Sequence, residues 1–268
     1  MPKVSVVIPC YNQGRFVNEA VNSVLEQSFQ HFEIIIVNDG SSDSFTNNLL
    51  KNYNKPKTKV VNTSINKGVS SARNTAIAKA RGKYILPLDA DDKIGKTYLE
   101  KAVKILDTKP KIGIVYCKAE VFGTTNGKWK LPKYKFPNIL VGNCIFVSAL
   151  FRKSDWNKTK GYRTEMKHGF EDWEFWLSLI ELGVKVYRIP KVLFYYRTQA
   201  NSRSKTICKN EDNAKQKIYN FHSGLYMRNI KKIIADLYEP MLKHNKDILF
   251  RINWKVKNLK LIFFIKKS

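Results

Sequence analysis

The first part of the chain alternates between two hydrophobic periodicities, and this alternation constrains the fold more than any other feature. Short apolar runs predict strands at 4–8, 33–37, 59–62 and 84–88. Apolar residues at helical spacing predict helices over 16–27 and 69–80. Repeated succession of strand and helix is typical of a parallel sheet with helices on both faces. The sequence therefore predicts an α/β fold.

Polar clusters follow three of these strands directly. They are Pro9-Cys10-Tyr11-Asn12, Asn38-Asp39-Gly40 and Asp89-Ala90-Asp91-Asp92. Open parallel sheets bind ligands at the carboxyl ends of their strands. We therefore expect all three clusters to face one rim of the sheet.

The acidic cluster suggests a metal site. Asp89, Asp91 and Asp92 lie within four residues, and three ionised carboxylates this close repel one another unless a cation is present. Oxygen ligands at an exposed rim suit Mg²⁺ or Mn²⁺ held jointly with substrate phosphates. The alternative is that Asp92 caps a helix beginning near Gly95.

Asp39 also has two interpretations. It could accept a hydrogen bond from an N–H group of a nucleotide base, or it could simply form an Asx-turn with Asn38 and Gly40. The chain contains neither G-x-G-x-x-G after the early strands nor G-x-x-x-x-G-K-[ST]. Dinucleotide dehydrogenase and P-loop functions therefore lose their main support.

The rest of the chain is less regular. We expect strands at 112–122, 144–152 and 192–197, with a loop at 128–137. A helix is expected over 171–182, in which Trp173 and Trp176 belong to the core more often than to a sugar site. After residue 204 the pattern becomes helical and basic. This organisation predicts a domain over 1–204 and a helical basic extension over 205–268.

The net charge of the chain limits the kinds of molecule that it can bind. The chain has 48 Lys and Arg against 22 Asp and Glu, a net charge of +26. This excess of positive charge attracts nucleotides, nucleic acid, anionic lipid or acidic polysaccharide, although it can also serve as a solubilising surface.

The four cysteines form no CxxC pair, which argues against disulfides or a zinc site and favours the cytoplasm. The N-terminal run reads as a strand and not a secretory signal, and no apolar run approaches the ~20 residues of a membrane span.

Several motifs, in order, resemble family 2 glycosyltransferases of the GT-A fold. They are Val4-Ser5-Val6-Val7-Ile8-Pro9-Cys10-Tyr11-Asn12, Ile36-Val37-Asn38-Asp39-Gly40-Ser41-Ser42-Asp43, Asn66-Lys67-Gly68 with Ala72-Arg73-Asn74, Leu88-Asp89-Ala90-Asp91-Asp92, Gly161-Tyr162 and Gly169-Phe170-Glu171-Asp172-Trp173. The resemblance covers about residues 3–204. It implies a GT-A, Rossmann-like, mostly parallel sheet flanked by helices.

The resemblance also implies a function. Such enzymes move a sugar, with inversion, from a nucleotide diphosphate donor to an acceptor hydroxyl. We expect a metal-dependent hexosyl- or N-acetylhexosaminyltransferase that uses a UDP-sugar and a saccharide or lipid-linked acceptor, in surface polysaccharide or glycoconjugate synthesis. No nucleic-acid partner is expected.

Site roles are carried over from the resemblance residue by residue. Asp91 would bind Mg²⁺ or Mn²⁺, and Asp89 would face the metal or the ribose. Asp172 matches the general base, with Glu171 as the alternative, and both stand at a predicted helix N-terminus whose dipole favours an ionised carboxylate. The remaining donor-side residues are Pro9, Tyr11 and Asp39 around the base, Lys67 and Arg73 beside the donor, and Arg197 at the diphosphate.

One position departs from the family pattern. Gln199 stands where the family often has a His, so a metal or diphosphate contact from an imidazole is replaced by an amide or lost. His168, just before the acidic pair, could contact the acceptor or act as a second acid or base. A lone loop His more often does neither.

The C-terminal segment adds a further expectation. Apolar residues at helical spacing over 248–263 alternate with Lys and Arg, as in a basic amphipathic helix on the inner face of a cell membrane. Packing on the domain or dimerisation would give the same pattern. Two rival functions also stay open: a non-catalytic binder of polyanions or lipid, and a metal-dependent nucleotidyltransferase.

Overall fold

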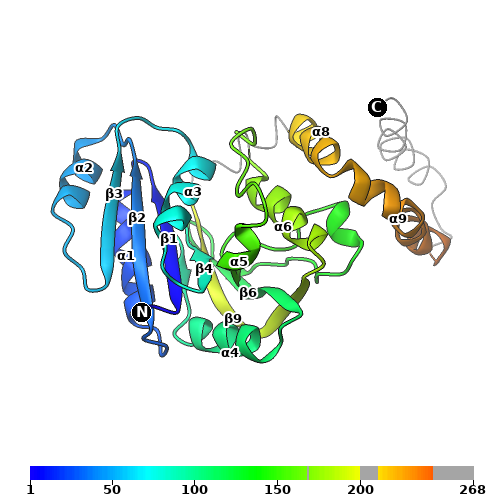
Figure 1. Cartoon of the computed structure of the whole chain (residues 1–268), viewed down its shortest axis with the longest axis horizontal. Helices are drawn as coiled ribbons and strands as arrows, with labels where there is room; N and C mark the ends of the chain where they lie inside the picture. Colours follow the sequence, from blue (N-terminus) through cyan, green and yellow to red (C-terminus); the bar gives the residue numbers. More distant parts are fainter. Residues whose placement is uncertain (168, 200–210, 244–268) are drawn as a thin grey trace.

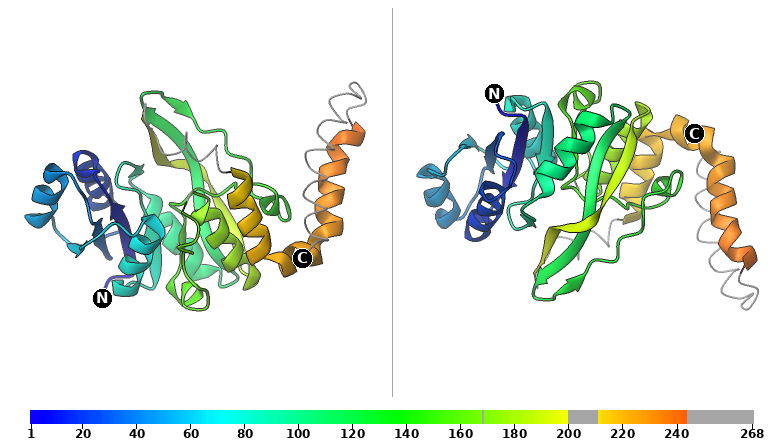
Figure 2. Two further views of the ribbon diagram at one scale, coloured as in Figure 1. Left: turned by 90° about the horizontal axis from the view of Figure 1, so that it is seen from above. Right: turned by 90° about the horizontal axis from the view of Figure 1, so that it is seen from below.

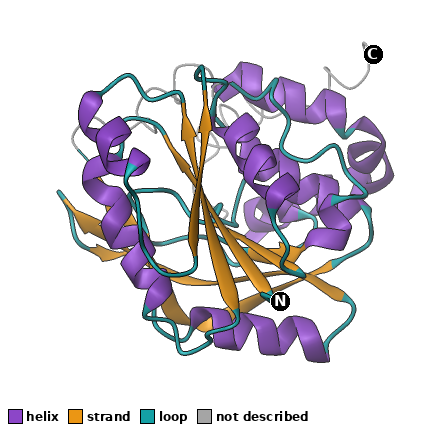
Figure 3. Ribbon diagram, turned by 60° about the vertical axis from the view of Figure 1, so that its left-hand side comes forward, coloured by secondary structure: helices purple, strands orange, loops and turns teal. Residues whose placement is uncertain are grey.

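The computed structural model describes residues 1–167, 169–199 and 211–243, with side chains in the last stretch up to residue 236. Figure 1 shows a sheet that runs through the body of the protein, with the last described helix projecting from the end opposite α2 (Ser44–Lys51). Helices cover the sheet on both sides (Figure 3). The predicted α/β class and flanked sheet are therefore confirmed.

The first half of the sheet is parallel. Its strands pair in the order β3-β2-β1-β4. The bounds are β1 (Val4–Cys10), β2 (Phe32–Asp39), β3 (Thr58–Thr63) and β4 (Tyr84–Pro87). In register, Val7 of β1 lies opposite Ile35 on one side and Pro87 on the other. The four predicted strands thus form and end together at one rim.

Four helices connect or flank these strands. Two are predicted, α1 (Gly14–Leu25) and α3 (Val69–Lys79), while α2 is not. Helix α4 (Tyr98–Thr108) is predicted only as a helix beginning near Gly95, in the alternative for Asp92. Helix α2 buries only Thr46 and Leu50, so its apolar pattern is weak, and it begins where the Asp43 carboxylate accepts a hydrogen bond from the Thr46 backbone N–H. The buried face of α4 does lie at helical spacing, so that helix was predictable from the sequence.

The second half of the sheet mixes directions. The sheet continues β4-β8-β6-β9-β5, with β7 paired to β6. The bounds are β5 (Lys93–Ile94), β6 (Ile112–Gly123), β7 (Gly127–Lys128), β8 (Leu150–Arg152) and β9 (Lys185–Thr198). Strands β6 and β9 are parallel, whereas β8 runs antiparallel to both β4 and β6. In Figure 2, β6 and β9 run together as an arm away from the body.

Two strand predictions in this half had wrong bounds. The apolar run 144–149 is a buried loop, and only 150–152 is a strand. Cys144, Ile145 and Phe146 are apolar because that loop is covered, which periodicity cannot distinguish from a strand. Strand β9 begins seven residues before the predicted position 192, at Lys185.

Helix α6 (Glu171–Glu181) fills the centre of the second half. Trp173 and Trp176 are 1 % and 0 % exposed. Their indole N–H groups donate to the carbonyl oxygens of Ile139 (2.7 Å) and Ile145 (3.0 Å). The prediction that both tryptophans belong to the core is confirmed. Ile139 lies in a short 3₁₀ helix, η1 (Asn138–Leu140), and a single-turn helix α5 (Lys153–Trp156) follows β8.

The described part of the C-terminal extension packs on this half. It comprises α8 (Glu211–Phe221) and α9 (Ser223–Lys243). The Tyr226 hydroxyl donates to the Leu140 carbonyl at 2.6 Å, and the Lys217 ammonium donates to the Glu165 carbonyl at 3.0 Å. The predicted helix over 248–263 lies outside the described residues. Within the described ranges, no helix is both long and apolar enough to cross a membrane.

Candidate active site

A cavity of about 560 Å³ opens at the rim where β1, β2 and β4 end. Each predicted site residue lines it except Lys67 and Asp172. The lining comprises Pro9, Cys10, Tyr11, Gln13, Asp39, Asn66, Gly68, Val69, Ala72, Arg73, Asp89, Ala90, Asp91, Glu171, Tyr196, Arg197 and Gln199. The strand-end clusters therefore meet, as the sequence predicts for a parallel sheet.

Asp39 is committed to the loop after β3. Its carboxylate accepts backbone hydrogen bonds from Lys67 (3.1 Å) and Gly68 (2.8 Å). The predicted Asx-turn within 38–40 is therefore not what the carboxylate forms. Its hydrogen bonds instead hold the 63–68 loop over the cavity, and Lys67 contributes its backbone rather than a lining side chain.

Asn12 ties the turns after β1 and β2 together, a role the sequence analysis did not assign. Its side-chain oxygen accepts hydrogen bonds from the backbone N–H groups of Ser42 (2.8 Å) and Asp43 (3.1 Å). Asn12 adopts φ 54°, which Asn tolerates better than most residues. Neighbouring Tyr11 is left 43 % exposed at the cavity wall.

Arg73 links the two halves of the site. Its guanidinium, 2 % exposed, donates to Asp89 at 2.6 Å and to Glu171 at 2.9 Å. Both contacts are charge-assisted and the Glu171 contact is buried. Arg73 thus holds the turn after β4 against the N-terminus of α6, while also facing the cavity where a donor contact was predicted.

Asp91 is held by Gln199, the residue at the position that departs from the family pattern. The Gln199 amide nitrogen donates to Asp91 Oδ2 at 2.7 Å. Burial, and then the negative charge of Asp89, raise the pKa of Asp91 to about 6. A cation beside these carboxylates would relieve that repulsion.

Arg197 and Asp92 hold the turn after β4 through contacts with strand β9. Arg197 Nε donates to the Asp91 carbonyl at 2.8 Å, and its guanidinium pairs with Glu19 at 2.8 Å. Asp92, 1 % exposed, accepts a hydrogen bond from the Arg197 backbone N–H at 2.9 Å. The alternative role for Asp92 as a helix cap is wrong, because α4 begins at Tyr98 with Thr97 before it.

Asp172 lies at the first turn of α6 but outside the cavity lining. Its Oδ1 accepts from the Trp173 backbone N–H at 2.7 Å and its Oδ2 accepts from the Asn143 amide at 3.1 Å. Burial and then the charge of Glu171 raise the pKa of Asp172 to about 7, although Arg73 opposes this. A carboxylate with this pKa can accept a proton near neutral pH. His168 lies outside the described residues.

The fit of a metal ion can be judged from the donor set. Within the described ranges, no cluster of three or more His, Cys, Asp or Glu side chains is arranged to hold a metal. Asp89 and Asp91 supply two neighbouring carboxylates at the cavity. Mg²⁺ and Mn²⁺ sites in enzymes that bind phosphorylated substrates commonly use one or two carboxylates and take other ligands from phosphates and water. The pair fits such a shared site and does not fit an all-protein cage.

Curated relatives match most of the chain. A putative teichuronic acid biosynthesis glycosyltransferase, TuaG of Bacillus subtilis, is 32% identical over 219 residues, covering 76% of this chain and 82% of that protein. The putative glycosyltransferase EpsE of the same organism is 29% identical, covering 75% of each chain.

Solved structures share the fold. Residues 1–349 of Staphylococcus aureus TarS superpose with a TM-score of 0.61 at 25% identity, over 73% of this chain and 60% of that one. The Pyrobaculum calidifontis mannosyltransferase PcManGT, solved with GDP-Man and Mn²⁺, has a TM-score of 0.59 at 20% identity, over 76% and 59% of the two chains.

The family profile matches the region that builds the cavity. The profile of glycosyl transferase family 2 covers residues 5–172, from β1 to the acidic pair that opens α6. This range contains the three strand-end clusters, Arg73 and both carboxylates of the pair. The motif resemblance, the fold and the matched residues agree, and the chain belongs to glycosyl transferase family 2.

Proposed function

We propose that the protein transfers a sugar from a nucleotide diphosphate donor to an acceptor hydroxyl with inversion at the anomeric carbon. The observation that carries this proposal is the cavity, which joins the acidic strand-end turn to the N-terminus of α6. TarS has been solved with UDP-GlcNAc and PcManGT with GDP-Man, so the donor pocket of this fold accepts nucleotide sugars in those proteins. A UDP-sugar is the first donor to test.

The donor would lie over the rim of β1, β2 and β4. We assign Pro9, Tyr11 and Asp39 to the base pocket and Asp89 to the ribose or metal. Asp91 would hold Mg²⁺ or Mn²⁺ together with Asp89, and the bound ion would offset the negative charge that develops on the leaving diphosphate. Arg73 and Arg197 would position the turn on this side through their contacts with Asp89 and the Asp91 carbonyl. The Lys67 side chain, which does not line the cavity, would add positive charge from the adjoining loop.

We assign the general base to Asp172. Glu171 lines the cavity, but its carboxylate is already committed to an ion pair with Arg73 at 2.9 Å. Asp172 has its pKa raised to about 7 and is held by the neutral Asn143 amide, so it can take the acceptor proton and release it near neutral pH. A single displacement needs no enzymic nucleophile.

The setting of the reaction follows from the relatives. TuaG is described as a teichuronic acid biosynthesis glycosyltransferase, and a 29% identical relative from Escherichia coli is a chondroitin synthase, 27% of whose length the match covers. We propose that this protein acts in polysaccharide or glycoconjugate synthesis on the cytoplasmic side of the membrane. Residues 1–204 would form the catalytic domain and 205–268 the extension.

A panel of nucleotide sugars tests the proposal. The full chain is incubated with each donor, with Mg²⁺, with Mn²⁺ or with a chelator, and release of nucleoside diphosphate is measured. We expect metal-dependent release from at least one donor, and its loss in D91N and D172N. If added pyrophosphate instead converts a nucleotide sugar into nucleoside triphosphate and sugar phosphate, the protein is a nucleotidyltransferase, and full activity in both variants would remove the assignment.

A further inference from the structure

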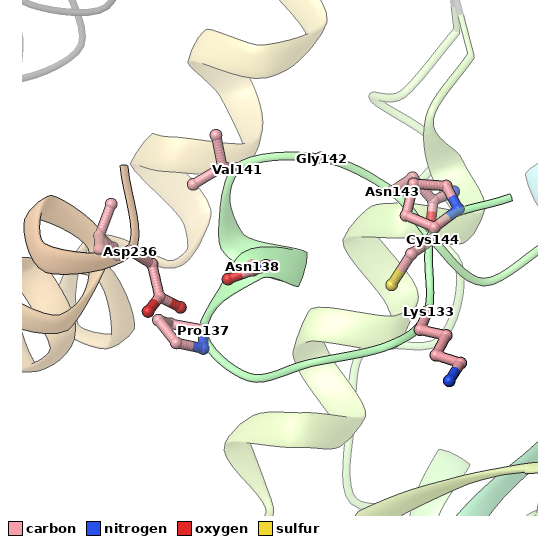
Figure 4. Close-up of a pocket in the computed structure, with 10 residues that line it drawn as sticks. Lys133, Pro137, Asn138, Val141, Gly142, Asn143, Cys144 and Asp236 are labelled. Atoms are coloured by element: carbon pink, nitrogen blue, oxygen red, sulfur yellow. The ribbon is translucent and has the colours of Figure 1, made fainter. Parts of the chain in front are cut away.

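A second cavity is lined by Asn143, the residue whose amide holds Asp172. It has a volume of about 320 Å³, at the lower end of the range for small-ligand sites. One wall is the segment 132–144, and the opposite wall is α9 through Ile233 and Asp236. In Figure 4, Asp236 stands on the helix at one side, while Lys133, Asn143 and Cys144 stand at the other.

Asn143 connects this cavity to the proposed base. It lines the cavity, and its amide nitrogen donates to Asp172 Oδ2 at 3.1 Å. Its side-chain oxygen accepts from the Ile145 backbone N–H at 3.1 Å, which fixes the orientation of the amide. Asn143 therefore belongs to the wall of this cavity and also contacts the proposed base.

The segment that forms the wall is strongly basic. Residues 121–144 contain Lys128, Lys130, Lys133 and Lys135 and no Asp or Glu. All four lysines are exposed. Lys135 pairs with Asp236 at 3.2 Å, whereas the other three form no ion pair with the described residues. Glu120 lies opposite Lys128 in the β6–β7 pair without forming one.

The lysines are presented by an anchored segment. Trp129 packs 4.7 Å from the Tyr196 ring, and the Tyr134 backbone N–H donates to the Tyr116 hydroxyl at 3.1 Å. Trp129 and Tyr134 thus contact the body, while Lys128, Lys130 and Lys133 are exposed. Lys133 lines the cavity, and Lys128 and Lys130 precede it in the same segment. The packed residues anchor the segment, while Lys128, Lys130 and Lys133 stay exposed and form no ion pair with the described residues.

We propose that this cavity and its row of lysines bind the acceptor, and that the acceptor is an anionic saccharide carrying carboxylate or phosphate groups. The inference rests on the proposed transferase function, since it names the acceptor class for that reaction. The reactive hydroxyl would lie at Asp172, the adjoining sugar in the cavity, and the charged groups further along the chain beside the lysines. The Asp236 carboxylate does not oppose such a ligand because Lys135 already pairs with it.

Binding of fluorescent probes tests the charge requirement without any turnover. The carboxylate probe is an oligosaccharide of alternating uronic acid and N-acetylhexosamine, compared with the same chain after reduction of its carboxylates to alcohols. The phosphate probe is a glycerol phosphate oligomer, compared with polyglycerol. We expect at least one charged probe to bind about tenfold more tightly than its neutral partner at low salt, with the difference shrinking as salt rises.

Two sets of variants locate the site. K128Q/K130Q/K133Q should weaken binding of the charged probe about tenfold. The control K51Q/K79Q/K104Q removes the same charge from exposed lysines of α2, α3 and α4. It should change the affinity for the charged probe less than about twofold. G142F should block the cavity, because Gly142 lines it and a Cβ added there meets nothing within 4 Å. G142A is its mild counterpart and should bind normally.

The outcomes separate this inference from the proposed function. UDP binding should be unchanged in every variant, and the KM for acceptor should rise without a change in the KM for donor. If no donor is ever turned over, the transferase proposal fails while the probe assay still reports on this site. Equal binding of charged and neutral probes, or equal loss in both lysine variants, would overturn the inference. The inference would also be overturned if K128Q/K130Q/K133Q weakened binding to phosphatidylglycerol vesicles but weakened binding of neither charged saccharide probe.

Discussion

The two sides of the site are built differently. On the donor side, the polar clusters lie at the ends of parallel strands: Asp39 is the last residue of β2, and Asp89 follows two residues after β4 ends. On the acceptor side, Asp172 follows a loop and opens α6, and its amide partner Asn143 comes from a separate covered segment. The first arrangement is set by local sequence, whereas the second depends on contacts between distant segments.

Arg73 is where the two sides meet. It contacts Asp89, sixteen residues away, and Glu171, 98 residues away. Gln199 makes a similar long-range contact to Asp91 across 108 residues. The donor side is thus completed by residues from the acceptor half, which suggests that the geometry of the metal pair depends on how the two halves pack.

Breaking the Arg73 link should have the largest effect on stability. R73M leaves Asp89 and Glu171 without their shared cation, and removal of one member of a buried charge network costs about 3–5 kcal/mol. Urea unfolding of R73M and of the control R81M measures this. Arg81 pairs with Glu33 from a side chain that is 65% exposed, so R81M should cost less than about 1 kcal/mol. Equal losses would show that Arg73 does not join the halves.

The donor side is tested by D91N. Loss of one carboxylate from the proposed metal pair should lower transfer about 10³-fold. The concentration of Mg²⁺ or Mn²⁺ needed for half-maximal rate should rise as well. D107N, on the surface of α4, is the control for loss of a carboxylate. Unchanged metal dependence in D91N would place the ion elsewhere.

The acceptor side is tested by D172N. Removal of a general base costs about 10²–10⁴-fold in rate, and it should lower kcat while leaving nucleotide affinity unchanged. Because the base must be deprotonated and the pKa of Asp172 is raised to about 7, the wild-type rate should rise as pH increases through 7. The pH–rate profile of E171Q distinguishes the two carboxylates. The rise should persist but move to lower pH, because the Glu171 charge that helps to raise the pKa of Asp172 is gone. Loss of the rise would make Glu171 the base.

The smallest predicted effect concerns how α8 and α9 dock on the acceptor side. His222, 2 % exposed, lies between Glu174 (3.2 Å) and Glu181 (2.9 Å). Burial lowers the pKa of His222, but the hydrogen bonds and charges of the two glutamates outweigh it, so the pKa is raised. The stabilisation is therefore fully present below the unfolded pKa of about 6.5 and is lost as pH rises through the higher folded value.

H222Q measures that contribution. The free energy of unfolding should fall by about 1 kcal/mol at pH 6, and by less at pH 9, because the stabilisation from charged His222 declines as pH rises above the unfolded pKa. Thermal unfolding of wild type and H222Q at both pH values provides the comparison. A difference that grows toward pH 9 would contradict the assignment of a charged His222.

Much of the fold was predictable from local pattern. The strands of the first half, the helices α1 and α3 and the acidic turn all follow from periodicity and from the residues that end each strand. The errors fall where burial comes from tertiary cover: the loop 144–149 is as apolar as a strand because α6 and its neighbours bury it. Its residue Ile145 accepts the Trp176 indole hydrogen bond.

The amino-acid sequence alone determined the family, the parallel half of the sheet and the set of polar residues at its rim, since spacing and turn chemistry act between near neighbours in the chain. Only the tertiary structure decided what each polar group contacts. It committed Asp39 to the 66–68 loop, placed Gln199 on Asp91, and set Asn143 between Asp172 and a second cavity. Those contacts join segments tens of residues apart, and no local pattern encodes which of them the packed sheet will bring together.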